Sequence, residues 1–278
     1  MNSGSDRDLN LDTAERLVRD AASEGAETVV LPEKWPVLGS PDDLLAGAES
    51  IDGPIMSAAS DWASSHGIFL IAGSFAEKRE GHERLSNTSV VFGPDGARLA
   101  AYRKIHLFDV EVDGVEYRES AVEEPGEEIV ACPLGDTGFE LGMTVCFDLR
   151  FPELFRILAL KGTNLVSVPS AFTSHTGGAH WEVLLRARAI ENQTFVAAAN
   201  QVGVAEPQYD SFGNSLVCDP WGTVLARIGE GEGIAVADCD LDSLERVRDQ
   251  IPAIDSRRPH AYPWAEHDQV DLATGNVR

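Results

Sequence analysis

The chain has 278 residues, of which 43% are hydrophobic, and its formal net charge at pH 7 is −24. Because nucleic acids and anionic membranes repel so acidic a surface, neither is expected as a partner. No apolar run approaches the roughly 20 residues that span a bilayer, and the polar first residues do not resemble a secretory signal, so we expect a cytoplasmic protein.

The first half of the chain alternates between helical and strand patterns. A helix is predicted over Asp12–Ser23, with a capping-box pair at Asp12 and Glu15, and a buried strand follows at Thr28–Leu31. The further expected elements are a helix over 54–65, strands over 68–72, 88–92 and 97–102, and a turn at Pro94–Gly96 between the last two.

Residues 102–125 show no clear period and are rich in charge and glycine, and a connection of that length is usually functional. Beyond it we expect strands near 129, 141–145, 165–168, 194–199, 215–218, 223–226 and 234–237, and helices over 152–161, 178–192 and 242–249. A turn at Asp219–Gly222 joins two of these strands. The alternation predicts a layered α/β fold, with residues 1–278 forming one domain without a linker.

Cys146 stands where a strand turns into a helix. It ends the apolar run that starts at Leu141, and Pro152 occupies the first turn of the next helix. A thiol there faces backbone N–H groups that can stabilise an oxyanion. The alternative is a small buried core residue, as most free cysteines are.

The other three cysteines, Cys132, Cys218 and Cys239, lie in or at the end of apolar runs and are interpreted as structural. No Cys or His spacing suits zinc. We therefore expect no metal and no cofactor.

Glu33 and Lys104 occupy positions equivalent to that of Cys146, just beyond the C-terminal end of a predicted strand. Side chains at such ends converge if the strands share a sheet. A carboxylate can take the thiol proton, and a cation can hold the thiolate and then the oxyanion. For each residue the alternative is an ordinary solvated side chain.

Three segments resemble the signatures of the nitrilase superfamily, the carbon–nitrogen hydrolases: Leu31–Glu33, Tyr102–Asp109 and Cys146–Glu153. The resemblance covers nearly the whole chain. It implies a four-layer α-β-β-α sandwich, a Glu33-Lys104-Cys146 triad, no cofactor, and a homodimer or larger assembly. It also implies that Glu119 orients the lysine or assists proton transfer, and that the backbone N–H of Phe147 joins Lys104 in an oxyanion hole.

Segments 169–172, 176–182 and 185–193 are similar to the amidase branch that holds omega-amidase and deaminated glutathione amidase. That resemblance makes Phe172, Thr173, His180 and Trp181 candidates for the substrate pocket. For Trp181 the alternative is a core aromatic on the predicted helix. The expected activity is therefore cysteine-dependent hydrolysis of a small carboxylate-bearing amide, with ammonia released. The alternatives are a nitrilase and a non-catalytic scaffold on the same fold.

Two further expectations concern the ends and the surface of the chain. The family normally opens with a short apolar strand before the first helix, and here Met1 stands where that strand would end, so we expect an additional N-terminal strand in the native protein. The acid excess is spread along the chain, and Lys34, Lys78, Lys104 and Lys161 are its only lysines. Such a surface suggests adaptation to high salt, which screens self-repulsion.

Overall fold

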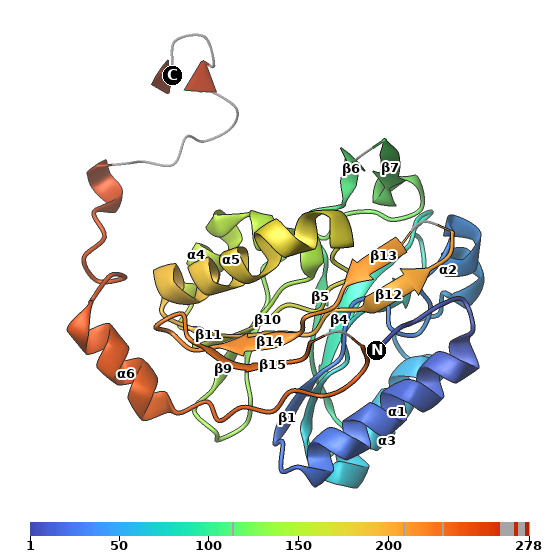
Figure 1. The fold of residues 1–278 in the computed structure, drawn as a ribbon, viewed down its shortest axis with the longest axis horizontal. Helices are drawn as coiled ribbons and strands as arrows, with labels where there is room; N and C mark the ends of the chain where they lie inside the picture. The colour runs from blue at the N-terminus through green and yellow to red at the C-terminus, as the bar shows by residue number, and fades with distance from the viewer. Residues whose placement is uncertain (113, 208, 230, 262–269, 272–275, 278) are drawn as a thin grey trace.

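Two β-sheets pack face to face at the centre of the computed structural model, which describes residues 1–112, 114–207, 209–229, 231–261, 270–271 and 276–277 (Figure 1). One sheet has five strands in the order β1-β2-β4-β3, with β5 beside β4. The other has six strands in the order β15-β14-β11-β10-β9-β8. Buried side chains such as Phe69 and Val91 from the first sheet join Leu141 and Val166 from the second in one apolar core.

The first sheet is covered on its outer face by two helices, α1 (Arg7–Ser23) and α3 (Pro54–His66). The apolar stripe of α1, which includes Ala14, Leu17 and Val18, is buried against this sheet. The strands are β1 (Thr28–Val30), β2 (Phe69–Ile71), β3 (Phe75–Glu77), β4 (Ser86–Phe92) and β5 (Arg98–Arg103).

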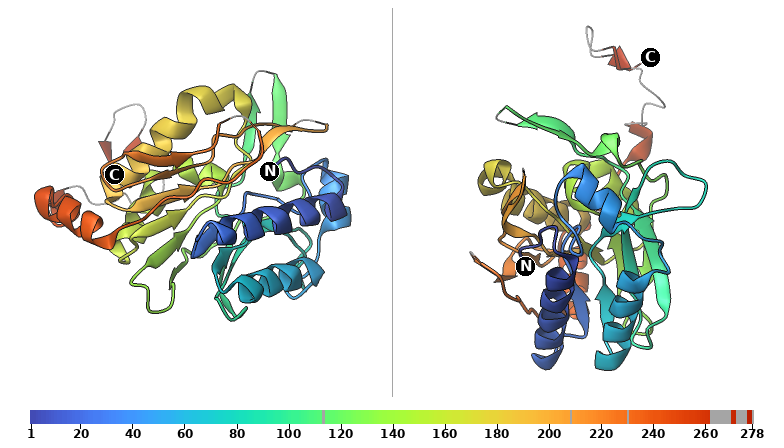
Figure 2. Two further views of the ribbon diagram at one scale, coloured as in Figure 1. Left: turned by 60° about the horizontal axis from the view of Figure 1, so that its bottom comes forward. Right: turned by 90° about the vertical axis from the view of Figure 1, so that its right-hand side faces the viewer.

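The second sheet is covered by α4 (Pro152–Leu160) and α5 (Ser174–Asn192), which lie side by side on the opposite side of the molecule from α1 and α3 (Figure 2). The predicted α-β-β-α sandwich is therefore confirmed. The strands are β8 (Ala131–Pro133), β9 (Glu140–Met143), β10 (Leu165–Ser167), β11 (Phe195–Ala198), β14 (Leu216–Cys218) and β15 (Val224–Arg227).

The strand directions bring three chain segments to one end of the sandwich. β1 runs parallel to β2, and β4 is antiparallel to both β2 and β5. Consequently β1 and β5 point the same way, and their C-terminal ends lie at the same edge of the sheet. In the second sheet β9 and β10 are parallel. Loops that leave these strand ends build the site described below.

Both predicted hairpin turns are confirmed. Gly93 donates to Ala97 O (2.8 Å) between β4 and β5, and Asp219 donates to Thr223 O (3.0 Å) between β14 and β15. Gly96 adopts φ +79°, a backbone conformation that favours glycine at this turn.

Several boundaries and elements differ from the sequence predictions. Helix α1 begins at Arg7, because Asp6 rather than Asp12 caps it by accepting from Leu9 N (3.1 Å). Helix α5 begins at Ser174 rather than Gly178. Elements that the sequence did not predict include α2 (Pro41–Gly47), β3, β12 (Val202–Ala205) and β13 (Tyr209–Phe212), together with the two strands inside the connection over 102–125, which was expected to be irregular. Helix α6 (Leu241–Gln250) lies close to the predicted range.

The long connection from 102 to 125 contains a β-hairpin of β6 (Asp109–Val112) and β7 (Val115–Arg118), which stands out from the sandwich in Figure 1. A 3₁₀ turn over Glu119–Ala121 follows it directly. The remaining elements are 3₁₀ turns over Cys146–Arg150 and Pro259–Ala261 and the pair β16 (Val270–Asp271) and β17 (Asn276–Val277).

The strand expected near 234–237 is absent from the described residues, which is a correction. Ile234 and Val236 instead line one side of a groove of about 800 Å³, and β1 and Met1 also line it. Both segments border this groove, and no ladder joins them within the described residues. Among the described strands, β1 pairs only with β2, and the expected additional N-terminal strand stays a prediction.

No helix within the described ranges is long and apolar enough to cross a membrane.

Candidate active site

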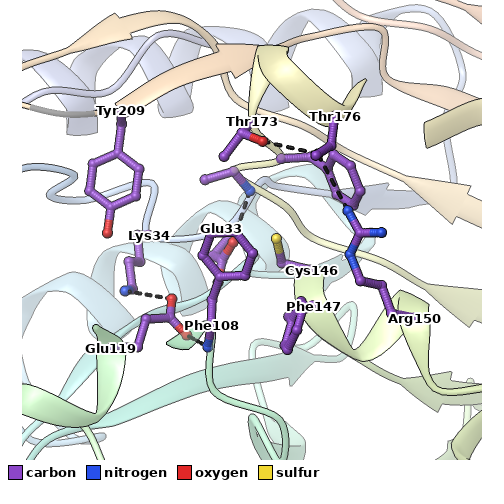
Figure 3. A pocket seen from close by; sticks show the side chains of 12 residues that line it. Glu33, Lys34, Phe108, Glu119, Cys146, Phe147, Arg150, Thr173, Thr176 and Tyr209 are labelled. Carbon is purple, nitrogen blue, oxygen red and sulfur yellow. Dashed lines mark hydrogen bonds and ion pairs between the residues drawn. The ribbon is translucent and has the colours of Figure 1, made fainter. Parts of the chain in front are cut away.

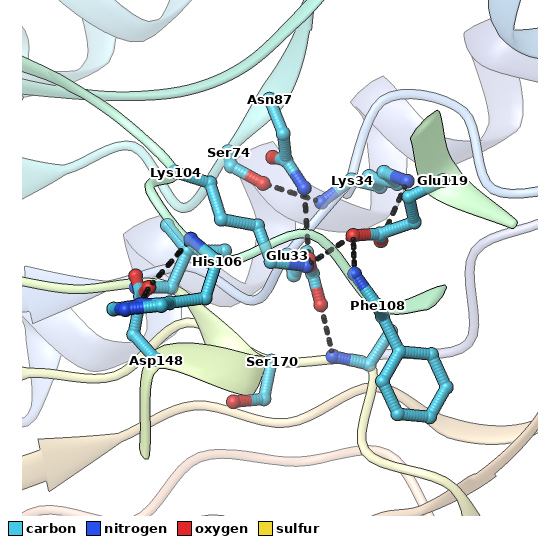
Figure 4. Close-up of polar contacts among 12 residues, drawn as sticks. Glu33, Lys34, Ser74, Asn87, Lys104, His106, Phe108, Glu119, Asp148 and Ser170 are labelled. Atoms are coloured by element: carbon cyan, nitrogen blue, oxygen red, sulfur yellow. Dashed lines mark hydrogen bonds and ion pairs between the residues drawn. The ribbon is translucent and has the colours of Figure 1, made fainter. Parts of the chain in front are cut away.

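Four side chains that the sequence singled out converge at this end of the sandwich. Glu33 follows β1, Lys104 follows β5, Cys146 follows β9, and Glu119 follows the β6–β7 hairpin. Lys104 Nζ lies 3.0 Å from Glu33 Oε1 and 2.7 Å from Glu119 Oε2 (Figure 4). Glu33, Lys104 and Cys146 are all buried, which strengthens the interactions between their charges.

The backbone of Cys146 is left-handed, with φ 47°. A non-glycine residue in this conformation costs on the order of 1–3 kcal/mol and persists only where the surroundings impose it. Here Cys146 N donates to Pro169 O (2.8 Å), and the residue opens the 3₁₀ turn that leads into α4. The sharp turn directs the thiol toward Glu33, and Figure 3 shows the sulfur at the pocket.

Asp148 braces this turn, although the sequence analysis did not single it out. Its buried carboxylate accepts from Tyr102 Oη (2.6 Å) and from Val145 N (2.8 Å). The ring of His106 lies 2.7 Å away through Nδ1 and stacks on Phe151 at a centroid distance of 3.5 Å. Asp148 thus ties the cysteine turn to β5 and to the segment that carries Lys104.

Glu33 is held in one orientation by hydrogen bonds to both oxygens. Asn87 Nδ2 donates to Oε1 (2.8 Å), and Ala171 N donates to Oε2 (2.8 Å). Burial, together with the negative charge of Glu33, raises the pKa of the Cys146 thiol well above its usual value. The resting thiol is therefore protonated, and the Glu33 carboxylate lies where it can accept the thiol proton.

Lys104 and Glu119 stabilise each other's charges. Burial alone would lower the pKa of Lys104, but Glu119 and Glu33 raise it well above its usual value. Burial alone would raise the pKa of Glu119, but Lys104 and Lys34 hold it down at about 2. Glu119 Oε2 also accepts from Phe108 N (2.8 Å). Both residues are therefore ionised at neutral pH.

A pocket of about 420 Å³ opens beside the thiol (Figure 3). Three of the predicted pocket residues, Phe147, Phe172 and Thr173, line it. Phe147 lies in the first turn of a helix, where backbone N–H groups have no acceptor within the helix. The other lining residues are Glu33, Lys34, Phe108, Glu119, Cys146, Arg150, Ala171, Thr176 and Tyr209.

The lining residues include neither of the other two predicted pocket residues, His180 and Trp181. His180 is exposed, and its Nδ1 lies 3.2 Å from Arg150 Nη1. Trp181 is fully buried, donates to Asn214 O (2.8 Å) and packs on Phe172 with ring centroids 5.1 Å apart. The structure thus places both residues behind the pocket wall, and Trp181 in the core.

Arg150 is the main pocket residue that the sequence analysis passed over. Its guanidinium lies 5.0 Å from the ring centroid of Phe172 and 3.3 Å from Thr176 Oγ1. Arg150 and Phe108 both lie inside segments that resemble family signatures, so their position in the sequence could have marked them as site residues. Tyr209 lies in no such segment.

Within the described ranges, no cluster of three or more His, Cys, Asp or Glu side chains could hold a metal ion.

A four-layer α-β-β-α sandwich with a glutamate, a lysine and a cysteine gathered at one end has the architecture of the nitrilase superfamily. The chain belongs to the carbon–nitrogen hydrolase family, whose sequence profile matches residues 1–249.

Relatives of known activity point to amide hydrolysis. The chain is 41% identical over 255 residues to the zebrafish (Danio rerio) omega-amidase NIT2, covering 91% of this chain and 90% of that protein. It is 39% identical over 250 residues to a deaminated glutathione amidase of Synechocystis, covering 89% of this chain and 92% of that protein. The crystal structure of Saccharomyces cerevisiae Nit3, of the nitrilase superfamily, superposes with a TM-score of 0.83 at 32% identity, covering 92% of this chain and 93% of Nit3. The chain is an amide-hydrolysing enzyme.

Proposed function

We propose that this enzyme hydrolyses the terminal amide of small carboxylate-bearing acids through a thioester on Cys146. The observation that carries the proposal is the position of the buried thiol. It lies beside a base, Glu33, in a pocket that the guanidinium of Arg150 also lines. The first feature supports the chemistry, and the second supports the choice of substrate.

In the acylation step Glu33 takes the proton of the Cys146 thiol while the sulfur attacks the amide carbon. The carbonyl oxygen becomes an oxyanion, which Lys104 and the backbone N–H of Phe147 stabilise. The C–N bond then breaks, Glu33 returns the proton to the leaving nitrogen, and ammonia departs. A thioester between the acyl group and Cys146 remains.

Water resolves the thioester in the second step. Glu33 takes a proton from the water, the hydroxyl oxygen attacks the thioester carbon, and the C–S bond breaks. The proton returns to the sulfur, which releases the carboxylic acid and restores the thiol. Glu119 acts in both steps by keeping Lys104 charged and oriented, since Lys104 Nζ bonds to both glutamates.

Arg150 selects the substrate in this proposal. A guanidinium pairs with a carboxylate through two parallel hydrogen bonds, and Arg150 is held by Thr176 and His180 on the helix side of the pocket. Phe108, Phe147 and Phe172 supply apolar walls between this cation and the thiol.

The test is a panel of linear substrates assayed for ammonia in high salt. We expect release from ω-amides such as 2-oxoglutaramate, and none from the corresponding ω-nitriles. The opposite preference would establish the alternative, a nitrilase, because the triad suits both bonds. Ammonia release that survives Cys146→Ala would refute the cysteine mechanism. A panel without any turnover would refute the proposed substrate class.

We also infer a homodimer that pairs through the outer face of α4 and α5. This face carries exposed apolar side chains, including Leu160 (50% exposed), Val183 (66%) and Ile190 (49%), and exposed apolar clusters mark interaction sites. Light scattering after size-exclusion chromatography should give twice the chain mass, and Val183→Glu should reduce the measured mass to that of the monomer.

A cytoplasmic location and one domain over residues 1–278 are likewise our predictions.

A further inference from the structure

Lys34 and Glu123 are buried charged residues beside the site to which the proposed mechanism gives no role. Lys34 directly follows Glu33, and Glu123 comes four residues after Glu119. Their exposures are 1% and 0%. Lysine and glutamate are almost never buried so completely unless they are paired.

The two residues extend a row of buried side chains of alternating charge, which runs from Glu33 through Lys104 to Glu119. Lys34 Nζ lies 3.2 Å from Glu119 Oε1 and 2.9 Å from Glu123 Oε1. Glu119 thus lies between two lysines, with Lys34 on one oxygen and Lys104 on the other. Figure 4 shows Glu119 bridging the two ammonium groups.

The fold places both residues in costly positions. Neither oxygen of Glu123 has a hydrogen bond of good geometry within the described residues. Lys34 Nζ lies close enough to Glu123 to form an ion pair, but the geometry does not meet that of a hydrogen bond. Burial, against the opposing charge of Lys34, raises the pKa of Glu123 to about 7. Lys34 itself has a left-handed backbone, with φ 49°.

A buried ion pair of this kind is weak evidence for stability, since apolar residues of similar volume often serve as well or better. Strained backbone and perturbed ionisable groups gather instead at functional sites. The location of this pair, in contact with Glu119, therefore calls for a role in the reaction.

We propose that Lys34 is a positioning residue for amide hydrolysis, which holds Glu119 Oε1 so that Oε2 stays on Lys104, and that Glu123 serves as the counter-ion that keeps Lys34 in place. This inference rests on the proposed function, because Lys104 matters only if it stabilises the thiolate and the oxyanion.

The expected consequence is a loss in turnover rather than in substrate binding. Without Lys34, Glu119 is held only at Oε2, by Lys104 and by Phe108 N. The carboxylate can then turn about Oε2 and shift Lys104 relative to Glu33. A displacement of about 1 Å in a catalytic group can cost on the order of 100-fold in rate. Lys34 lines the pocket, but two of its three ammonium protons are directed to Glu119 and Glu123, so we expect its loss to change KM little.

The test compares Lys34→Met with the double variant Lys34→Met/Glu123→Leu. The single variant leaves Glu123 buried without a counter-ion, whereas the double variant replaces the whole pair by apolar residues. We expect the melting temperature to fall in the single variant and to recover in the double variant. We expect kcat to remain about 10- to 100-fold below wild type in both, with KM within about threefold.

A double variant that recovers kcat together with its melting temperature would overturn the inference, because Lys34 would then be structural only. A raised KM at unchanged kcat would also overturn it, since Lys34 would then bind substrate. If the single variant does not fold, the double variant alone decides.

A second readout separates this inference from the proposed function. The rate at which iodoacetamide alkylates Cys146, followed by intact mass with Cys146→Ala as the background, requires no substrate. We expect several-fold slower alkylation in the double variant, because a loosened Lys104 stabilises the thiolate less. A wild type that releases no ammonia from any amide refutes the proposed function, whereas equal alkylation rates refute the role of Lys34.

Discussion

Replacing Arg150 by methionine tests the proposed substrate class. The substitution removes the guanidinium but keeps an apolar side chain of similar reach over Phe172, 5.0 Å from its ring centroid in the wild type. No hydrogen bond within the described residues joins Arg150 to the triad or to Glu119, although its charge acts on the Cys146 thiol. The change therefore removes the candidate carboxylate partner, and the neutral substrate measures any effect on the chemistry itself.

The size of the effect follows from the exposure of Arg150. Hydrogen bonds to a charged group contribute about 1.5–3 kcal/mol, which corresponds to about 10- to 150-fold in affinity. Arg150 is only partly buried, so solvent screens its charge and the lower part of that range applies. We expect kcat/KM for a carboxylate-bearing ω-amide to fall about 10- to 30-fold, chiefly through KM.

The assay measures ammonia release from two substrates of equal chain length, 2-oxoglutaramate and the neutral pentanamide. Arg150→Met should lose activity only toward the carboxylate, so the ratio of the two kcat/KM values should collapse. Arg186→Met is the matched control, because Arg186 binds Gly222 O (2.7 Å) and does not line the pocket. An equal loss on both substrates, or no loss on either, would refute the role of Arg150 as the carboxylate partner.

Three other outcomes are expected. Cys146→Ala should reduce ammonia release by about 1,000-fold or more, because the nucleophile is lost, while the melting temperature changes little; residual turnover near wild type would contradict the mechanism. The folded-state pKa of Glu123 is raised to about 7, so this acid costs stability progressively as pH rises from its unfolded value toward 7. In urea unfolding, the difference in unfolding free energy between Glu123→Gln and wild type should therefore shift in favour of the variant as pH rises from about 5 to about 7, and a pH-independent difference would contradict the shift. Because the net charge is −24, the melting temperature should rise from 0.1 M to 2 M KCl as repulsion is screened, and a flat response would argue against adaptation to salt.

The catalytic candidates were predictable because each is marked locally. Glu33, Lys104 and Cys146 each follow a strand that can be read from its apolar residues, and the parallel directions of β1 and β5 bring the first two to one edge. Their chemistry also requires these residue types together. Local pattern and chemistry therefore agree at these positions.

The pocket was less predictable because its walls meet only through tertiary packing. Arg150 and Phe172 come from different segments, and the guanidinium of Arg150 lies 5.0 Å from the ring centroid of Phe172. Tyr209 lies on β13, a strand that pairs only with β12 among the described strands. Trp181 was a candidate on its segment alone, but its contact with Asn214 O draws it into the core. No short stretch of sequence carries these relations.

Two errors in the predicted elements, the start of α1 and the strand expected near 234–237, both arise from tertiary packing. Asp6 and Asp12 can both cap a helix. The helix begins after Asp6, because Asn10 in its first turns then donates to Gly4 O and Pro36 O. The contact with Pro36 is tertiary, so no local sequence rule includes it. Ile234 and Val236 have a strand-like alternation, but a ladder needs a neighbour within reach, and within the described residues none joins them to β1 across the groove that both border.

The β6–β7 hairpin connects the surface of the enzyme to its chemistry. The residues that flank the hairpin are Phe108 and Glu119, and a 2.8 Å hydrogen bond from Phe108 N to Glu119 Oε2 joins them. The hairpin body projects from the sandwich (Figure 1). We expect a ligand that displaces the hairpin also to displace the Glu119 carboxylate, which holds Lys104. Such a ligand would change the rate of hydrolysis from the surface of the protein while the substrate pocket stays open.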